Sequence, residues 1–146
     1  EARNRSDAPI LIAEDSPLLS KLITDCLKKA GYTKLIVNSN GQEAWDKLCE
    51  FRKDGTLDEK VHMIITDIEM PQMDGHRLTK LVKEDETFRH IPVVIFSSLV
   101  NEEMRHKGEM LGADAQLTKP EIGKLVGAID SLMDERKEKM AQKEQQ

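Results

Sequence analysis

Chemically reactive side chains directly follow four of the five short apolar runs in this sequence. In chain order they are Glu14 with Asp15, Asp67, Ser97 and Lys119. Asp67 stands in the stretch MIITDIEMPQMDG, where an aliphatic run ends in one carboxylate and the chain then turns at once. An acid at the end of such a run indicates a functional site. Each residue alone would be weak evidence, and the prediction rests on their joint order.

The residue types indicate metal-assisted phosphoryl chemistry. Three carboxylates brought together would repel one another and raise each other's pKa values unless a cation lay between them. Hard oxygen ligands with open positions favour Mg²⁺, which retains several waters. A lysine and a hydroxyl beside the metal complete a site for a phosphoryl group, because they stabilise the charge on its oxygens. The sequence has no Gly-rich phosphate loop, so the phosphate donor need not be a nucleotide.

Asp67 is the best candidate for a nucleophile among these acids. Carboxylates form acyl phosphates in phosphoryl transfer. We expect Asp67 to stand alone at the centre of the site, flanked by Glu14 and Asp15, which can hold the metal. The Met70-Pro71 turn then leads the chain away, which leaves room for a partner to approach.

The elements that must position these side chains are strands buried on both faces. Apolar runs without polar alternation are typical of a parallel sheet. Segments with helical periodicity lie between them, so we expect an α/β fold with a doubly wound five-stranded parallel sheet. The carboxyl ends of its strands share one edge, where ligands bind in open sheets, and this edge would gather the reactive residues. The expected strands are 10–13, 35–37, 63–66, 93–96 and 115–118.

Capping residues mark the expected helices. Ser16 and Pro17 begin the first helix and Gly31 ends it, while Asp74 and Asn101 begin two later ones. Another helix is expected from residue 41 to 51 and the last from residue 121. Residues 52–60, RKDGTLDEK, are predicted to form a polar, mobile loop. All four histidines are interpreted as surface or loop residues, because none has metal-ligand spacing.

Length and composition indicate one aliphatic domain without a membrane or nucleic-acid footprint. The 146 residues can bury a single core, only 3% are aromatic, and acidic and basic residues are interleaved to a net charge of −5. No apolar run approaches the ~20 residues needed to span a bilayer. Two cysteines without C-x-x-C spacing fit a reducing cytoplasm. We expect a linker at 1–8, the domain at 9–133, and a charged tail at 134–146 that extends the last helix or is disordered.

The ordered motifs resemble the receiver domain of two-component response regulators: an acidic pair, a lone Asp followed by MPxMDG, a Ser, and Lys-Pro. The resemblance implies a flavodoxin-like fold with strand order 2-1-3-4-5. It implies Asp67 as phosphoacceptor, Ser97 as switch hydroxyl, and Lys119 as phosphate contact before a cis Lys119–Pro120 bond. It also implies Mg²⁺ held by Asp15 and Asp67, by Glu14 mainly through water, and by the backbone carbonyl of Glu69.

A narrower resemblance concerns the chemotaxis coupling proteins called CheV. The stretches TDIEMPQMDGHRLTKLVK, IFSSLVNEEM and GADAQLTKPEI are similar to their receiver half. The resemblance implies a cytoplasmic partner kinase of the phosphohistidine type, as in the chemotaxis kinase CheA. It also implies a link to the receptor and kinase array through an N-terminal adaptor domain similar to CheW, to which nothing in this sequence corresponds.

Two departures and two rival functions stay open. Most receivers carry an aromatic residue three places before the lysine, where this chain has Gln116, and Glu69 puts a possible charge near the phosphoryl group. A receiver would be a switch with only self-phosphotransfer and autodephosphorylation activity. The alternatives are a metal-dependent phosphohydrolase, to whose D-x-D motif residues 67–69 are loosely similar, and a receiver that no longer signals but serves as scaffold or phosphate sink.

Overall fold

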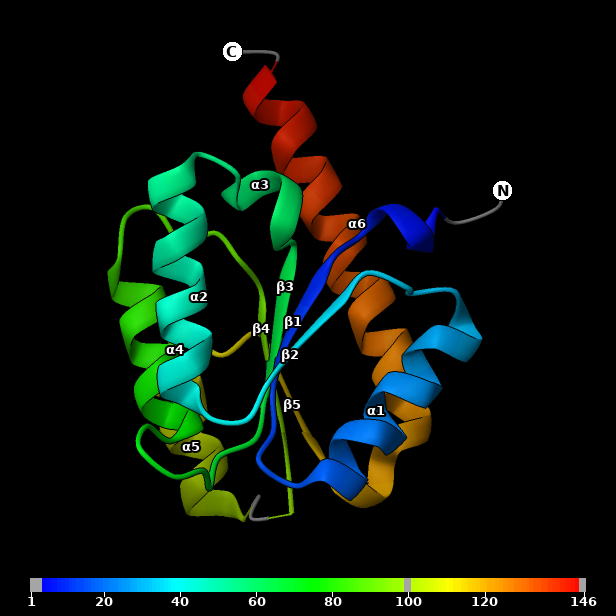
Figure 1. Cartoon of the computed structure of the whole chain (residues 1–146), viewed down its shortest axis with the longest axis vertical. Coiled ribbons are helices and arrows are strands. Elements are labelled where there is room, and N and C mark those ends of the chain that lie inside the picture. The colour runs from blue at the N-terminus through cyan, green and yellow to red at the C-terminus, as the bar shows by residue number, and fades with distance from the viewer. Residues whose placement is uncertain (1–3, 99–100, 145–146) are drawn as a thin grey trace.

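A five-stranded parallel sheet lies between two layers of helices in the computed structural model of the chain, which describes residues 4–98 and 101–144 (Figure 1). The strand order is β2-β1-β3-β4-β5, with all four pairings parallel. Helices α1 and α6 cover one face, and α2, α4 and α5 cover the other. The predicted fold class and strand order are therefore confirmed. The strands are β1 Ile10–Ala13, β2 Leu35–Asn38, β3 Met63–Thr66, β4 Val93–Ser97 and β5 Ala115–Thr118.

Burial explains why apolar runs located the strands so well. Every residue of β1, β3 and β4 is buried, because the central strands are covered on both faces. The edge strands β2 and β5 are only partly covered. Three strands have the predicted bounds, and β2 and β4 each continue one residue further.

The helices begin at the predicted caps. The Ser16 hydroxyl accepts a hydrogen bond from the Leu19 backbone N–H, and Asp74 and Asn101 cap α4 and α5 in the same way. Each cap fixes where the chain leaves the carboxyl end of a strand and enters the next helix. The helices are α1 Pro17–Ala30, α2 Gly41–Asp54, α3 Leu57–Lys60, α4 Gly75–Glu84, α5 Glu102–Leu111 and α6 Leu125–Glu144, with 3-10 turns η1 Arg5–Asp7 and η2 Lys119–Lys124.

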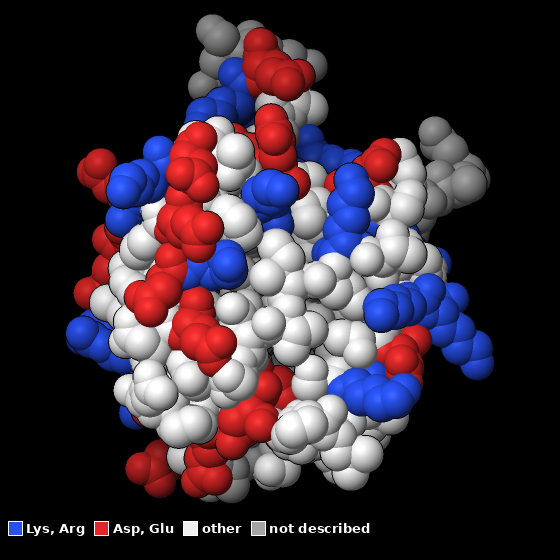
Figure 2. Space-filling view, viewed as in Figure 1, with Lys and Arg blue, Asp and Glu red and all other residues white. Residues whose placement is uncertain are grey.

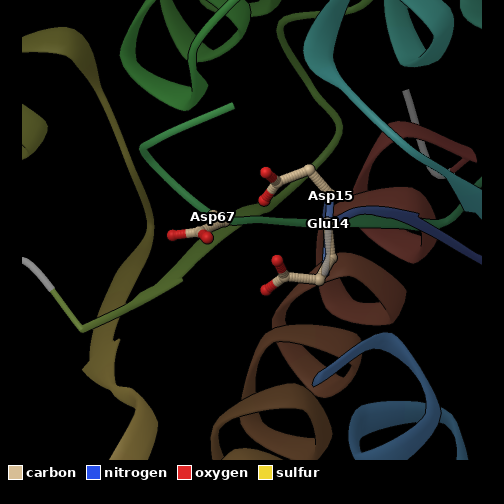
Figure 3. A group of neighbouring side chains, drawn as sticks. All are labelled: Glu14, Asp15 and Asp67. Carbon is tan, nitrogen blue, oxygen red and sulfur yellow. The ribbon is translucent and has the colours of Figure 1, made fainter. Parts of the chain in front are cut away.

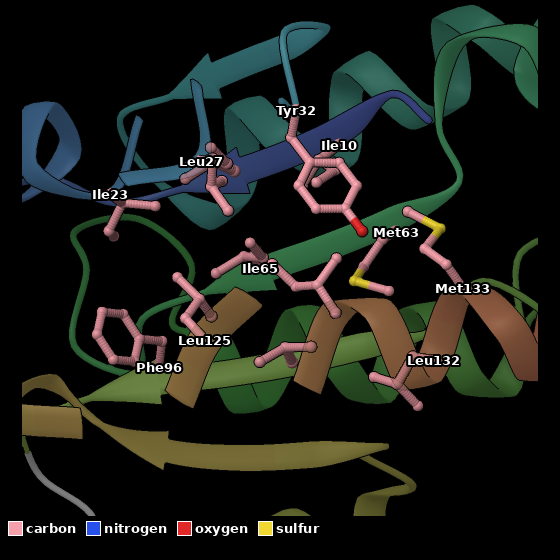
Figure 4. Packing of buried hydrophobic residues seen from close by; sticks show 13 residues of the cluster. Ile10, Ile23, Leu27, Tyr32, Met63, Ile65, Phe96, Leu125, Leu132 and Met133 are labelled. Atoms are coloured by element: carbon pink, nitrogen blue, oxygen red, sulfur yellow. The ribbon is translucent and has the colours of Figure 1, made fainter. Parts of the chain in front are cut away.

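Two aliphatic cores hold the layers together. One lies between the sheet and helices α1 and α6, and it includes Leu27, Tyr32 and Leu125 (Figure 4). The other lies between the sheet and helices α2 and α4, and it includes Leu48 and Val82. Neither core includes a side chain of α5. That helix is therefore attached to the domain by other means.

The segment 52–60 differs from its predicted loop. Helix α2 continues through Asp54, and after Gly55 the short helix α3 follows at once. The side chain of Leu57 is 7% exposed and belongs to the second core. The segment is helical on both sides of Gly55 and buries one apolar residue, so the prediction of a loop was wrong.

The N-terminal segment is held against the last helix. Helix α6 continues through the charged tail as far as Glu144. The N-terminal segment is held by Arg5, whose guanidinium forms an ion pair of 2.7 Å with Asp130 of α6 and donates to the Ala30 carbonyl. The buried Tyr32 hydroxyl donates to the same Asp130 carboxylate at 2.5 Å. Both termini are thus at the pole opposite the carboxyl ends of the strands (Figure 1).

Two local predictions are corrected. No peptide bond of the described residues is cis, so the Lys119–Pro120 bond is trans. Pro120 is the second residue of η2, where a backbone N–H would have no partner within the turn, and Thr118 with Glu121 caps this turn. His76 is 4% exposed in the first turn of α4, so its prediction as a surface or loop residue was wrong. Within the described ranges, no helix is long and apolar enough to cross a membrane.

Candidate functional site

Three carboxylates converge where β1 and β3 end. Because Ala13 pairs with Thr66 in the parallel register, the residues that follow them emerge side by side at the sheet edge. One carboxylate oxygen from each of Glu14, Asp15 and Asp67 lies within 4.8 Å of the other two. Figure 3 shows the three side chains directed toward one another from the ends of the two strands. Parallel pairing thus brings together acids that lie about fifty residues apart.

Lys119 brings a positive charge to these acids. Its ammonium donates a hydrogen bond of 2.9 Å to Asp67 Oδ2 and lies 3.1 Å from Glu14 Oε1. Burial alone would lower the pKa of Lys119, but its hydrogen bond to Asp67 and its ion pair with Glu14 raise that pKa above its ordinary value. The pKa of Glu14 is raised, chiefly by burial and in part by the charge of Asp67. The cluster therefore carries more negative charge than one lysine can compensate.

The backbone around Asp67 holds its carboxylate in place. Asp67 Oδ1 accepts a hydrogen bond of 2.7 Å from the Ile68 N–H, and the Ile68 carbonyl accepts one of 2.8 Å from Gly75. A Cβ atom on Gly75 would lie 1.8 Å from the Asp67 carbonyl oxygen, so only glycine allows this approach. The turn of the MPQMDG stretch thus folds back against the strand end that presents Asp67.

An open cavity of about 580 Å³ surrounds the acids and the lysine. Sequence reasoning placed Glu14, Asp15, Asp67, Glu69 and Lys119 in the site, and all five line this cavity. On the face shown in Figure 2, acidic side chains gather at the lower end, where the strands end, and over α2. The remaining lining residues are Ser16, Leu19, Met70, Pro71, Asp74 and Ser98.

The hydroxyl groups are arranged less simply than expected. Ser97 is fully buried at the end of β4, paired with Thr118 of β5, whereas the exposed Ser98 lines the cavity. β4 ends at Ser97 and Ser98 lies in the turn that follows, so the two hydroxyls have different surroundings. Asp74 caps α4 as predicted and also faces the cavity, a placement that sequence reasoning missed. Asp74 follows Asp67 by only seven residues across a tight turn, and this short spacing could have predicted its place in the site.

The donor set fits a hard divalent cation. Glu14 Oε1 is buried and no hydrogen bond reaches it, although the Lys119 ammonium is close. Three carboxylates lie together while Lys119 contacts only two of them, which leaves a binding site for further positive charge. All three ligands are oxygens, and the exposed position of Asp15 leaves room for water, as Mg²⁺ requires.

Comparison with known protein families supports the fold assignment. The family described as "Response regulator receiver domain" matches residues 10–130, which include all five strands and the whole acidic cluster. The chain belongs to this receiver domain family. Receiver domains are signalling modules, and the resemblance inferred from the motifs is confirmed at this level.

Relatives of the receiver domain differ in pathway. This chain is 34% identical over 125 residues to a gliding motility regulatory protein of Myxococcus xanthus. The match covers 84% of this chain but only 15% of that protein. The chain is 29% identical over 134 residues to the chemotaxis protein CheV3 of Helicobacter pylori, covering 90% of this chain and 43% of that protein. The chain thus spans well under two thirds of the length of both.

A solved structure supports the same assignment. The signal receiver domain of a signal transduction histidine kinase from Syntrophus aciditrophicus superimposes with a TM-score of 0.74 at 30% identity. The match covers 87% of this chain and 90% of that one.

Proposed function

We propose that this receiver domain accepts a phosphoryl group on Asp67 from the phosphohistidine of a histidine kinase. An Asp67 carboxylate oxygen attacks phosphorus, the phosphorus–nitrogen bond breaks, and the imidazole leaves with its electron pair. The observation that supports this most directly is the 2.9 Å contact between Lys119 and Asp67 inside a cluster of three carboxylates. That arrangement gives one acid a cation partner and leaves an open face for the donor.

The other side chains of the site stabilise the charge that this transfer brings. The Lys119 ammonium, already directed at Asp67 and Glu14, would shift onto the oxygens of the incoming phosphoryl group. Ser97 would serve as the switch hydroxyl at the end of β4. Mg²⁺, held by Asp15 and Asp67, by Glu14 through water and by the Glu69 carbonyl, would supply the remaining positive charge.

A chemotaxis pathway in the cytoplasm is the context we favour. The CheV3 protein matches 90% of this chain, more than the share matched by the gliding motility protein. The partner would be a chemotaxis kinase of the CheA type, and an adaptor domain outside this sequence would link the receiver to the receptor and kinase array. The net charge of −5 without a basic footprint supports a protein partner instead of nucleic acid.

Helix α1 offers an apolar surface at the edge of the site. Leu18 is 77% exposed and Leu22, one turn later, is 50% exposed, while their neighbour Leu19 lines the cavity. A kinase domain that delivers a phosphoryl group to Asp67 must come within bonding distance of this edge. We infer that Leu18 contacts the kinase during transfer.

Incubation with a small phosphodonor and Mg²⁺ tests the function. We expect one acyl phosphate per chain by intact mass, and none in Asp67→Asn. Asp74→Asn is the matched control, because Asp74 lines the same cavity and asparagine keeps the helix cap. Labelling retained in Asp67→Asn would count against the assignment. Many turnovers on phosphomonoesters would instead identify a phosphohydrolase, and no modification would leave a scaffold.

A further inference from the structure

A second cavity lies at the pole opposite the acidic site. Its volume is about 490 Å³, and it is formed where the N-terminal segment, the residue before β3 and helix α6 meet. Figure 1 shows the N-terminal segment beside α6, at the end of the molecule away from the carboxyl ends of the strands. None of the residues that line this cavity also lines the acidic site. The phosphotransfer proposed for Asp67 therefore makes no use of it.

Three cationic side chains line this second cavity, and one of them is already neutralised. The Arg5 guanidinium forms its ion pair of 2.7 Å with Asp130 and donates to the Ala30 carbonyl. The side chains of Arg136 and Lys137, by contrast, take part in no hydrogen bond or ion pair with any residue that the structure describes. Two positive charges in the lining are thus available to a ligand.

The acidic side chains of the lining do not neutralise these two charges. Asp7 accepts a hydrogen bond from the Asn4 side-chain amide, and Asp134 also has a partner of its own. Among the described residues, neither carboxylate forms an ion pair with Arg136 or Lys137. The cavity therefore has two cations that its own acids leave unpaired.

Arg136 is the cation that would gain most from a bound anion. Its side chain is partly buried, and burial lowers the pKa of its guanidinium below the ordinary value, with only the charge of Asp58 in opposition. The Asp58 carboxylate already lies 3.7 Å from the His90 ring. After burial, the charge of Arg136 also lowers the pKa values of His62 and His90. A partly buried charge among such neighbours is unfavourable, and an anion beside it would offset that cost.

The chemistry of the lining fits a phosphate group joined to a small organic body. A guanidinium presents its N–H groups in a planar fork that matches two oxygens of a phosphate, and an ammonium adds a compact charge. The lining also includes the apolar side chains of Ala8 and Met133 and the residue Tyr32. Cavities of about 300–1,000 Å³ are typical of small organic ligands. This cavity is therefore larger than a lone phosphate needs.

We propose that this cavity binds a small phosphate monoester, with its phosphate on Arg136 and Lys137 and its organic body against Ala8 and Met133. The site requires neither Mg²⁺ nor the acidic cluster, since the two cavities share no residue. Its lining comes from the N-terminal segment and from α6, which the Arg5 ion pair already joins. A bound ligand would hold these two elements together more firmly.

Titration with phenyl phosphate, followed by backbone amide NMR shifts of the whole chain, tests this proposal. EDTA removes divalent cations, and salt at about 0.15 M screens exposed charges. We expect saturable shifts confined to residues 4–8, 62 and 133–137. Inorganic phosphate should shift the same amides and bind about fivefold more weakly, because it lacks the apolar body.

Variants on one helix separate a built site from general charge attraction. Arg136→Gln should weaken phenyl phosphate binding by about tenfold, and Arg136→Lys by less, because it keeps the charge but loses the planar fork. Lys137→Gln should also weaken binding, which gives a second test if a change at Arg136 disturbs the helix. Lys139→Gln removes an exposed cation of α6 outside the lining and is the matched control with wild-type affinity.

Three results would overturn the proposal. The first is the absence of saturable shifts in the wild type. The second is an equal loss of affinity in Arg136→Gln and Lys139→Gln, which would show that α6 attracts anions without a site. The third is binding of anionic lipid vesicles or of a single-stranded oligonucleotide without binding of phenyl phosphate. That result would assign the same cations to a membrane surface or to nucleic acid.

Discussion

The Lys119 ammonium lies 2.9 Å from Asp67 Oδ2, although 52 residues separate the two in the sequence. Two strand pairings, β3 with β4 and β4 with β5, bring the residues together. The contact is the geometric centre of the site, because it joins the proposed phosphoacceptor to the one cation of the cavity lining.

Removing this cation should expose the repulsion among the carboxylates. We expect Lys119→Met to lower the free energy of unfolding by about 1–3 kcal/mol, since Asp67 and Glu14 would lose their charged partner in a largely buried site. Mg²⁺ should restore more stability in this variant than in the wild type, because it replaces the missing charge. Urea unfolding with and without Mg²⁺ measures both effects.

A surface lysine provides the control for this experiment. Lys124 forms an exposed ion pair with Glu121, so Lys124→Met should change stability by at most about 1 kcal/mol. Equal losses in the two variants would contradict a special role for the Lys119 contact.

Asp15 should be needed for metal binding and dispensable for folding. Its side chain is exposed, yet one oxygen lies within 4.8 Å of the other two carboxylates. We expect Asp15→Asn to weaken Mg²⁺ binding by about tenfold or more, since a charged ligand is lost. Thermal unfolding across a Mg²⁺ titration reports the affinity through the stabilisation of the folded state. Asp25→Asn, on the exposed side of α1, should bind Mg²⁺ like the wild type.

Stability should fall as the pH falls because of His76. Burial, and secondarily the charge of Lys107 with opposition from Asp74, lowers the pKa of His76 below its ordinary value, so the folded domain holds this ring neutral. Below about pH 6.5 the unfolded chain binds the proton first, and the folded state loses stability until the lower folded pKa is passed.

Replacing His76 tests this pH dependence. Urea unfolding at pH 7.5 and 5.5 should show a loss of about 1 kcal/mol in the wild type and a smaller loss in His76→Leu. The variant keeps part of the effect, because burial also lowers the pKa values of His62 and His90. Identical losses in the two proteins would show that His76 is not responsible.

Leu18 should matter for the kinase and not for the chemistry. We expect Leu18→Arg to slow phosphotransfer from a phosphorylated histidine kinase by about tenfold, equivalent to about 1.4 kcal/mol of lost docking. Labelling by a small phosphodonor should keep its wild-type rate, because Asp67 and Lys119 are untouched. Met110→Arg, which alters an equally exposed residue of α5, is the matched control. Parallel losses with both donors would place the effect in the site instead of the docking surface.

The sequence by itself determined the strands, most of the helix caps and the residues of the acidic site. Unbroken runs such as residues 63–66 are stable only when covered on both faces, and Ser16, Asp74 and Asn101 mark helix starts through bonds that are local in sequence. Parallel strands share one edge, so the order of the polar residues alone was enough to gather Glu14 and Asp67.

Only the tertiary structure decided which side chains are covered and by what. Leu57 packs a polar segment against the core, His76 is buried, and Gly108 makes room for Gln116. The periodicity of a sequence states which face of an element is apolar, but it does not state which distant surface will cover that face. The partners of these residues come from packing between elements far apart in the chain, and that information appears only when the chain is folded.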